Sequence, residues 1–423
     1  MSNSKILVLG SGFSAALVAS NIEKSLCKLR QPYELIHVSE KKYFFYQELI
    51  CDLLSGVAVF NDIVSDYRGL GIYKPGVSFI ESQIINIDLD SQIVETNQGV
   101  LNYDYLVLAI DESSNDIQTD IFNCKTPFNV LKLKEKIWKN LQAATFESKT
   151  SLRKRLLTFS VIGADAAGIQ ISCLLADYIN QLIKSKFQEI KKSQISINLL
   201  DEKSELDLKN NRFYNASIFY NLNKRNINLV MNSKIKYDEG KIEILSKSGM
   251  DSGVIISTKS KYLPDVLNRL PLPKDSDCRF FVDLYLKAEN YNNVFIIGEK
   301  SACLDLSEKC QPNSIGLKIQ AKICANNIIS MINNNPLKPL NQKTFVEFMP
   351  IGYRNCLITI KDFSFDGLLA WLLFRIIHLS TYIGIKSKVS AFLKLLFSLI
   401  NPVDTDIFLL EEISEYKREK ITV

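Results

Sequence analysis

The sequence of 423 residues predicts an α/β protein, because one pattern of apolar strand, glycine-rich turn and helix occurs twice. The two turns are Gly10-Ser-Gly12-Phe-Ser-Ala15 and Gly163-Ala-Asp165-Ala-Ala-Gly168. A third observation is the apolar strand Asn293–Ile297, which precedes a helix over Ile315–Ile332 and completes the first unit. The sequence therefore predicts two Rossmann-like dinucleotide-binding domains, with the second inserted in the first.

The first unit has the context that a dinucleotide-binding turn requires. Its elements are a strand over Lys5–Leu9, a helix over Ala16–Ser25 and a second strand over Tyr33–Val38. In the turn between them, Gly10 permits the tight bend, Gly12 lets the backbone approach a pyrophosphate, and the small Ala15 lets the helix pack on the strand. The helix N-terminus would then face the phosphates.

The second unit repeats this order with one change. Its elements are a strand over Leu157–Ile162, a helix over Ile169–Ile183 and a strand over Ile195–Leu200. The middle glycine of the turn is replaced by Asp165, which puts a negative charge where a pyrophosphate would lie. The turn alone leaves open whether this unit binds a nucleotide. Between the units, Ser82–Ile93 and Leu101–Ile110 are expected to be short strands that return to the first sheet.

Composition excludes several classes of protein. With 47% hydrophobic and 23% charged residues, the chain is typical of globular proteins. A net charge of +5 is too small for the basic surface of a nucleic-acid-binding protein, so no nucleic acid is expected as a partner. The basic clusters Lys149–Arg155 and Lys184–Lys192 are expected to be solvated helix surfaces.

Cysteine and histidine usage points to a reducing compartment without a metal site. The nine cysteines are an odd number and include no Cys-x-x-Cys pair, so neither a disulfide framework nor a zinc site is expected. The two histidines, His37 and His378, lie in apolar segments and are expected to pack in the core or at an interface.

The C-terminal quarter differs from the rest. Gly367–Ser380 and Val389–Ile400 are mostly apolar with a narrow polar stripe, which is typical of helices that lie on a membrane surface. A dimer interface or a lid over the core is the alternative. The expected anchor residues are Trp371, Arg375, His378, Lys386, Lys388 and Lys394. The full prediction is an α/β protein with two Rossmann-like domains plus a C-terminal amphipathic-helix membrane anchor.

Targeting signals are not expected. The chain runs from Met1 directly into its first strand, and it has no uninterrupted apolar stretch of about 18 residues. We therefore expect a peripheral membrane protein on the cytoplasmic face. The expected domains are an FAD-binding domain in two parts (1–113 and 263–335), a connection (114–155), an NAD(P)H-binding domain (156–262) and a membrane-associating domain (336–423).

The chain resembles the type II NADH dehydrogenases, the single-subunit NADH:quinone oxidoreductases, over nearly its whole length. Besides the two glycine turns, the resemblance rests on the segments Tyr43-Phe-Phe-Tyr-Gln47-Glu-Leu-Ile50, Tyr103-Asp-Tyr-Leu-Val-Leu-Ala109, Asn293–Glu299, Pro312–Ile328 and Gly367-Leu-Leu-Ala-Trp371-Leu-Leu-Phe-Arg375-Ile-Ile-His378. The resemblance implies FAD as the cofactor, NADH as a substrate, a quinone as the electron acceptor, a membrane lipid surface as a partner and a homodimer.

The resemblance also implies roles for individual residues. Those expected to bind FAD are Gly10, Gly12, Phe13, Ser14, Ala15, Gln47, Ala109, Gly298 and Glu299, with Glu40, or Ser39 in the neighbouring register, at the adenosine ribose. Those expected at NADH are Gly163, Asp165, Gly168 and Asp201. Hydride would pass from nicotinamide to flavin and two electrons on to the quinone, so that no side chain is a certain catalytic residue.

Several positions depart from the family pattern. Gln170 replaces a glutamate, Asp111 replaces a glycine after Ala109, and Thr258-Lys259 replaces Ala-Gly. The family's Ala-Gln-x-x-x-Gln of the quinone region reads Ser314, Ile315 and Ile319, which removes two hydrogen-bonding amides.

Three functions therefore remain open. The first is an FAD-dependent NAD(P)H:quinone oxidoreductase, acting on a quinone such as a naphthoquinone. The second is a flavin-binding, catalytically weak, membrane-associated homologue. The third is a sulfide:quinone oxidoreductase, for which Cys124, Cys310 and Cys356 are the candidate thiols.

Overall fold

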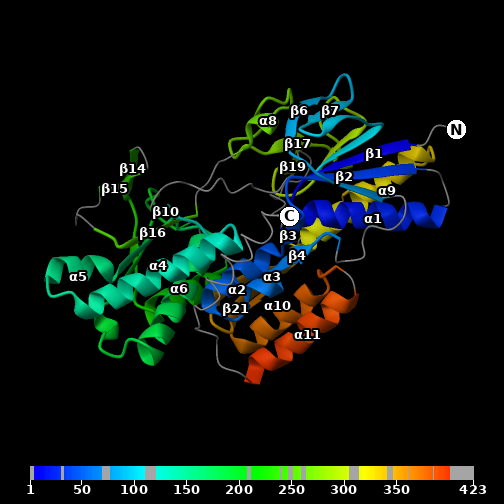
Figure 1. The fold of residues 1–423 in the computed structure, drawn as a ribbon. Coiled ribbons are helices and arrows are strands. Elements are labelled where there is room, and N and C mark those ends of the chain that lie inside the picture. Colours follow the sequence, from blue (N-terminus) through cyan, green and yellow to red (C-terminus); the bar gives the residue numbers. More distant parts are fainter. Residues whose placement is uncertain are drawn as a thin grey trace.

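The protein contains two parallel sheets flanked by helices, a small antiparallel sheet, and a C-terminal helix pair (Figure 1). The computed structural model describes residues 4–29, 33–68, 77–109, 121–206, 211–238, 241–245, 251–258, 263–303, 314–340, 346–361, 363–383 and 385–400. Asp111, Lys259 and Cys310 lie outside these ranges.

The first sheet draws on both halves of the chain. Its strand order is β18-β9-β1-β2-β5, and every neighbouring pair is parallel. The strands are β1 (Ser4–Leu9), β2 (Tyr33–Ser39), β5 (Val77–Glu81), β9 (Tyr105–Leu108) and β18 (Val294–Ile296). Helices α1 (Phe13–Leu29) and α9 (Ser314–Ile332) pack against each other beside this sheet (Figure 1). Because β18 comes after the second sheet in sequence, all strands of the second sheet lie in the chain between two strands of the first.

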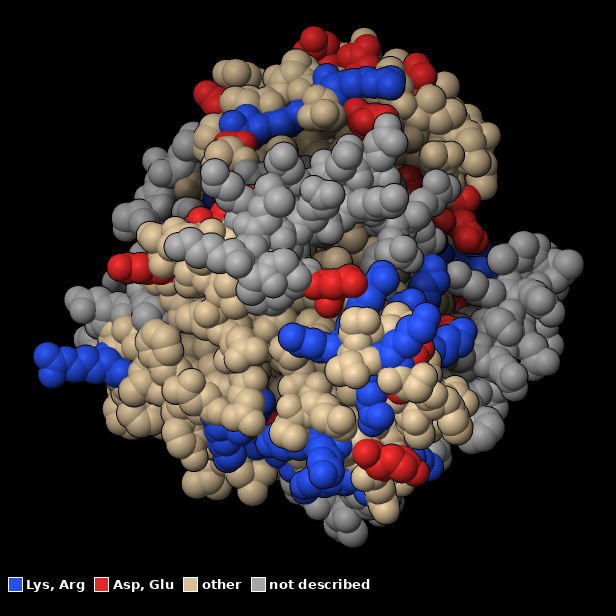
Figure 2. Space-filling view, turned by 90° about the vertical axis from the view of Figure 1, so that its left-hand side faces the viewer, with Lys and Arg blue, Asp and Glu red and all other residues tan. Residues whose placement is uncertain are grey.

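The second sheet repeats the arrangement with the order β10-β16-β11-β12-β13, again all parallel. Its strands are β10 (Ile121–Phe122), β11 (Thr158–Ile162), β12 (Ser196–Leu200), β13 (Ile227–Val230) and β16 (Val254–Ser257). The helices of this half are α4 (Pro127–Phe146), α5 (Thr150–Leu156), α6 (Ala166–Ser185) and α7 (Arg212–Lys224). The basic residues of α5 and of the end of α6 lie mostly at the surface, as expected, and Figure 2 shows Lys and Arg side chains gathered along this half of the molecule.

The strands expected to return to the first sheet behave differently from the prediction. Only β9 joins that sheet, whereas β6 (Ile84–Asp88), β7 (Ile93–Thr96) and β8 (Gly99–Asn102) form their own antiparallel sheet. The physical reason is that short strands joined by tight turns form antiparallel pairs with their neighbours in sequence.

The remaining elements are short. They are β3 (Tyr43–Phe45) with β4 (Val64–Asp66), β14 (Lys234–Asp238) with β15 (Lys241–Leu245), β17 (Phe280–Val282) with β19 (Ser301–Cys303), the helices α2 (Ile50–Ser55), α3 (Phe60–Ile63) and α8 (Asp265–Asn268), and the 3-10 turns η1 (Gln47–Leu49) and η2 (Lys192–Gln194).

The C-terminal part consists of an antiparallel sheet and two helices. The sheet contains β20 (Val346–Gly352), β21 (Asn355–Ile360) and β22 (Phe363–Phe365), and the helices are α10 (Leu368–Leu379) and α11 (Ile385–Ile400). α10 packs on β21, and β20 packs on α6 of the second unit.

An ion pair ties the C-terminal sheet to the second unit. The Arg225 guanidinium donates from Nε and Nη2 to the two oxygens of Asp177, each at 2.9 Å. The Asp177 carboxylate also accepts the backbone N–H of Tyr353 at 2.7 Å. Because Asp177 lies on α6 and Tyr353 follows β20, this carboxylate joins two parts of the fold that are far apart in sequence.

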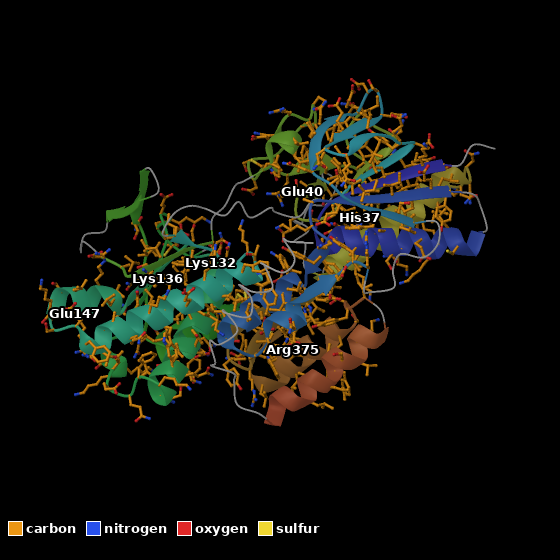
Figure 3. All side chains as sticks on the ribbon, viewed as in Figure 1. His37, Glu40, Lys132, Lys136, Glu147 and Arg375 are labelled. Atoms are coloured by element: carbon orange, nitrogen blue, oxygen red, sulfur yellow. The ribbon has the colours of Figure 1, made fainter. Side chains whose placement is uncertain are left out.

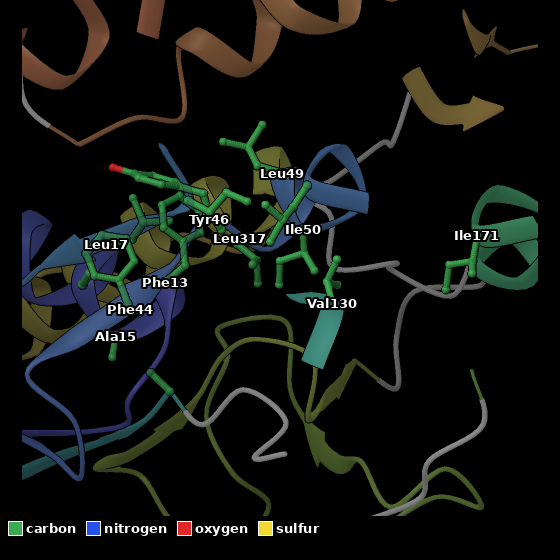
Figure 4. Packing of buried hydrophobic residues seen from close by; sticks show 14 of the residues in the cluster. Phe13, Ala15, Leu17, Phe44, Tyr46, Leu49, Ile50, Val130, Ile171 and Leu317 are labelled. Carbon is green, nitrogen blue, oxygen red and sulfur yellow. The ribbon is translucent and has the colours of Figure 1, made fainter. Parts of the chain in front are cut away.

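The main core runs from the first sheet through α2 and α4 to α6. Figure 4 shows Phe13, Phe44 and Tyr46 stacked beside Leu317 of α9, with Ile50 and Val130 further along. The ring centroids of Phe13 and Tyr46 are 5.5 Å apart. α2 packs on α4 and α6, and η1 reaches the start of α9, where the family resemblance puts the quinone, through the hydrogen bond from Ser314 N to Glu48.

Candidate functional site

The first glycine turn has the geometry of a dinucleotide cradle. Gly10 has φ +152°, and a Cβ on it would lie 2.0 Å from the carbonyl oxygen of Ala109, so no side chain fits there. Its N–H donates to Val38 O at 3.0 Å, which holds the turn against β2. The turn leads directly into α1, whose first N–H groups have no partner within the helix. These groups are where a pyrophosphate binds at a helix N-terminus.

The buried His37 side chain supports this turn through a hydrogen bond and packs against aromatic rings. The Nε2 atom of His37 lies 2.8 Å from Gly10 O, and its ring packs edge-on to Tyr67 and Phe79. Because a carbonyl only accepts hydrogen bonds, Nε2 carries the proton and donates it. Burial lowers the pKa of His37 to about 4, so the ring is neutral. The expectation that His37 packs in the core is confirmed, and the structure adds its support of the turn.

The two candidates for the adenosine ribose differ in exposure. Ser39 is buried, and its hydroxyl donates to Lys41 O at 2.6 Å. Glu40 is exposed at the end of β2, and its N–H donates to Ser11 Oγ of the glycine turn at 3.1 Å. Figure 3 shows Glu40 beside the end of the first sheet, close to His37. The carboxylate of Glu40 is thus available to a ligand, whereas the hydroxyl of Ser39 is engaged.

Other predicted FAD residues converge on the same edge of the sheet. Ala109 and Gly298 follow β9 and β18, and the carboxyl ends of parallel strands meet at one edge. Gly298 has φ +98°, and its N–H donates to Gln320 Oε1 at 3.0 Å. Glu299 is half-buried beside it, and Gln47 is exposed at the start of η1. Phe13, Ser14 and Ala15 are buried in the first turn of α1.

The second glycine turn is closed by Asp165. This residue is the N-cap of α6, and its Oδ1 accepts the N–H of Gly168 at 2.9 Å. A Cβ on Gly168 would lie 1.7 Å from Gly163 O, so no side chain fits at this position of the turn. However, the helix N-terminus already holds a carboxylate, so a pyrophosphate would compete with it for the same donor.

The remaining positions of the second unit lie at the same edge. The buried carboxylate of Asp201 accepts from Ala164 N at 2.7 Å and from Lys203 N at 3.1 Å. The hydroxyl of Thr258 donates to Ile162 O at 3.1 Å. Gln170 is half-buried on α6. These two hydrogen bonds join the Asp201 carboxylate to the glycine turn and to the residues that follow β12.

The predicted quinone positions begin α9. Ser314 is buried, Ile315 is half-buried and Ile319 is 37% exposed. The backbone N–H of Ser314 donates to Oε1 of Glu48 at 2.5 Å. The other oxygen of Glu48, Oε2, forms a short contact with Nδ1 of His378 on α10. Sequence reasoning missed Glu48.

A second polar pair lies one helical turn away. The Arg375 guanidinium contacts Asp52 Oδ2 at 2.8 Å, both side chains being largely buried, and stacks 5.3 Å above the Trp371 ring. Glu48 and Asp52 stand at i and i+4 in an otherwise apolar segment, as Arg375 and His378 stand at i and i+3 in another. The sequence signal for this contact was the presence of two carboxylates in one apolar segment and of two basic residues in another.

These contacts correct the expected role of three anchor residues. Trp371 and His378 of α10 are buried, and the side chain of Arg375, labelled in Figure 3, is largely buried. These residues attach the helix to the body of the protein instead of facing a membrane. The physical reason is that Glu48 and Asp52 provide buried partners for them. Lys388 is exposed as expected, and the side chains of Lys386 and Lys394 lie outside the described residues.

The outer face of the helix pair is apolar and exposed. Its members, exposed by 37% to 77%, are Leu368, Leu369, Leu373 and Ile376 of α10 and Val389, Phe392, Leu393 and Leu396 of α11. Within the described ranges, none of the helices is both long enough and apolar enough to cross a bilayer. No group of three or more potential metal ligands occurs in those ranges either.

Of the candidate thiols of a sulfide-oxidising site, Cys356 is buried and Cys124 is half-buried. Burial raises the pKa of Cys124 to about 12 and also raises the pKa of Cys356. A thiol with a raised pKa is protonated and a poor nucleophile, so the packing interpretation of these cysteines is favoured.

The two parallel sheets, each with a glycine turn at its edge, define the class: oxidoreductases with two dinucleotide-binding folds. No protein-family model matches the chain. The chain is similar over most of its length to type II NADH dehydrogenases, which confirms the resemblance found in the sequence. A probable NADH dehydrogenase of Dictyostelium discoideum is 20% identical and matches 92% of this chain and 87% of the relative. The type II NADH:quinone oxidoreductase NdhA of Mycobacterium tuberculosis is 22% identical over 92% of this chain and 85% of the relative.

Solved structures share the fold. NDH2 from Plasmodium falciparum, solved in complex with NADH, has a TM-score of 0.77 and 16% identity and covers 96% of this chain and 100% of that chain. The sulfide:quinone oxidoreductase of Aquifex aeolicus has a TM-score of 0.69 and 17% identity, with 88% of each chain covered.

Proposed function

We propose that this protein is an FAD-dependent NAD(P)H:quinone oxidoreductase that binds peripherally to a membrane. The observation that carries the proposal is the convergence of the Gly10 turn, Glu40, Ala109 and Gly298 at one edge of the first sheet. A second glycine turn stands at the corresponding edge of the second sheet. The similarity to type II NADH dehydrogenases along most of the chain supports the same activity.

The residues of the first edge fit FAD. The N–H groups at the start of α1 would hold the pyrophosphate, and Glu40, rather than Ser39, would accept hydrogen bonds from the ribose hydroxyls. Gln47, Ala109, Gly298 and Glu299 would orient the ring and its ribityl chain. When bound, FAD supplies the two-electron chemistry, and the protein supplies binding, orientation and a dry site.

NADH would bind at the second turn, with Asp201 at its ribose. Asp201 lies at the end of β12, where an acid accepts from ribose hydroxyls and disfavours a 2′-phosphate. The quinone would approach along Ile315 and Ile319. Membrane attachment would use the exposed apolar face of α10 and α11, because a quinone dissolved in lipid must be reached from the bilayer.

A second candidate function follows from Asp165. Its carboxylate already accepts the N–H that a pyrophosphate would use, which favours a flavin-binding protein that is weakly active with nicotinamides. The two candidates share the FAD site and the membrane surface, and they differ in their response to NADH.

An anaerobic titration of the detergent-purified protein separates them. NADH and then NADPH are added while the visible flavin spectrum is followed, and a quinone is added afterwards. Bleaching by a nicotinamide and recovery with the quinone are the expected results. A flavin spectrum that ignores both nucleotides would refute the oxidoreductase and leave the binding protein. Sedimentation with liposomes tests attachment, and light scattering after size-exclusion chromatography tests the expected homodimer.

A further inference from the structure

The Glu48–His378 contact brings a carboxyl and an imidazole together beside the predicted quinone positions. Glu48 comes from η1, His378 from α10 and Ser314 from the start of α9, so three separate elements meet here. The Ser314 hydroxyl lies 3.2 Å from the same Nδ1 atom of His378 that contacts Glu48. Oε2 of Glu48 is buried, and His378 is 6% exposed. Such a buried pair is held in one geometry, which is what a proton-transfer step requires.

The groups around the pair decide where its proton lies. Burial raises the pKa of Glu48 to about 7, and the neighbouring Asp52 carboxylate adds to the rise. Burial, followed by the charge of Arg375, lowers the pKa of His378 to about 3. On α9, the Lys318 ammonium donates a hydrogen bond to Ser380 O at 2.8 Å. Below neutral pH the carboxyl therefore keeps its proton, and Oε2–H of Glu48 donates to Nδ1 of His378.

At the two positions of α9 where the family has glutamine amides, this chain has isoleucines, which cannot donate a proton. Ile315 and Ile319 stand at i and i+4 on α9, so they form one apolar stripe that starts next to Ser314. This stripe can pack against a quinone ring, but it cannot bond to a quinone oxygen. Glu48 is an acidic group that bonds to Ser314, the residue directly before this stripe.

We propose that Glu48, held by His378 and Ser314, donates a proton to the quinone oxygen during quinone reduction. The inference rests on the proposed oxidoreductase function and deepens it. Reduction of a quinone to a quinol takes two electrons and two protons. Two electrons and one proton reach the quinone as a hydride equivalent from the reduced flavin. For the second proton, the Oε2–H bond of Glu48 breaks and a quinol O–H bond forms. The Glu48 carboxylate then takes up a proton from solvent water, which restores the carboxyl for the next turnover.

The test separates the two half-reactions of the holoenzyme. Glu48→Gln keeps the shape of the side chain and removes the acidic proton. We expect the rate of flavin reoxidation by ubiquinone-1 to fall about 100-fold, the lower end of the contribution of a general acid. Flavin reduction by NADH should be unchanged, and so should reoxidation by ferricyanide, because ferricyanide accepts electrons without protons. Glu135→Gln, the same substitution beside Lys139 on the exposed surface of α4, is the matched control and should change none of these rates.

The pH profile provides a second readout. In the wild-type enzyme the rate of quinone reduction should fall as the pH rises through about 7, because Glu48 loses its proton there. In Glu48→Gln this fall should disappear. Equal quinone rates in Glu48→Gln and wild type, with the pH profile retained, would overturn the proposal. A proportional loss with ferricyanide would also overturn it, because it would mean a structural defect.

A spectroscopic measurement does not depend on turnover. The infrared spectrum of the resting holoenzyme at pH 6 should contain the carbonyl stretch of a protonated carboxylic acid, which is lost in Glu48→Gln and kept in Glu135→Gln. A spectrum in which Glu48→Gln loses only carboxylate bands would refute the assignment of the proton. Failure of the wild-type flavin to respond to NADH would instead refute the proposed function, so the two failures are distinguishable.

Discussion

Replacing Asp165 by glycine should strengthen NADH binding. The Asp165 carboxylate caps α6 through a 2.9 Å hydrogen bond from Gly168 N, which occupies a donor and leaves a negative charge at the helix N-terminus. Asp165→Gly frees the donor and removes the charge. The cost to the helix is small, because glycine is only a few tenths of a kcal/mol worse than aspartate as an N-cap.

The magnitude follows from Coulomb's law at an exposed site. A phosphate bound to the same N–H groups would lie about 6 Å from the carboxylate, the sum of two hydrogen-bond lengths. In a water-like dielectric each of the two pyrophosphate charges is then repelled by about 0.7 kcal/mol, and removing about 1.4 kcal/mol lowers the Kd about tenfold. At 0.15 M salt, screening over a Debye length of about 8 Å reduces the gain to about threefold.

The assay is calorimetric titration with NADH at low and at physiological ionic strength. Asp165→Asn separates the two causes, because it keeps a side-chain acceptor for Gly168 N and removes only the charge. Most of the gain, with its salt dependence, should therefore appear in Asp165→Asn as well. A Kd for Asp165→Gly within twofold of wild type at low salt would refute the reasoning.

Three further predictions concern other parts of the fold. Gly10→Ala should purify without flavin, because its Cβ would lie 2.0 Å from Ala109 O; a full flavin complement by absorbance would contradict this. Asp177→Ala should lower the free energy of unfolding by about 3–5 kcal/mol in a urea titration, because it leaves a largely buried Arg225 unpaired, and a loss below about 1 kcal/mol would count against that role. Between pH 6.5 and 4, the free energy of unfolding of wild type should fall by about 3 kcal/mol relative to His37→Gln, because His37 takes up a proton in the unfolded chain but stays neutral when buried, with a pKa of about 4. A difference that stays constant with pH would disprove this.

Local sequence patterns predicted the two parallel sheets and their order of insertion. The glycines that follow the apolar runs place the turns, because a Cβ on Gly10 or on Gly168 would overlap a neighbouring carbonyl oxygen. The pairing of β6 to β8 with one another could not be read from the same runs, since strand pattern does not specify the partner strand.

The candidate site was predictable only where a motif carries it. The turn residues and Glu40 are placed by their distance from a strand end. The contacts of Glu48 and Asp52 with α10 join residues more than 300 positions apart. Neither segment has a local pattern that identifies the other as its partner. Arg375 and His378 on an apolar helix fitted a membrane surface as well as a buried ion pair, and tertiary packing decided between these interpretations.

The division of the first sheet between the two ends of the chain has a consequence for synthesis. Strand β18 pairs with β9, yet the whole second sheet is encoded between them, so the first sheet lacks an edge strand until residue 296 has left the ribosome. The second unit, by contrast, is contiguous from β10 to β16 and has all its strands earlier. Domains fold as units during translation, so the nascent chain completes its inner domain first and carries the unfinished edge of β9 exposed meanwhile. The interval in which β9 waits for β18 is the stage of biogenesis at which this chain is most open to misassembly and to chaperones.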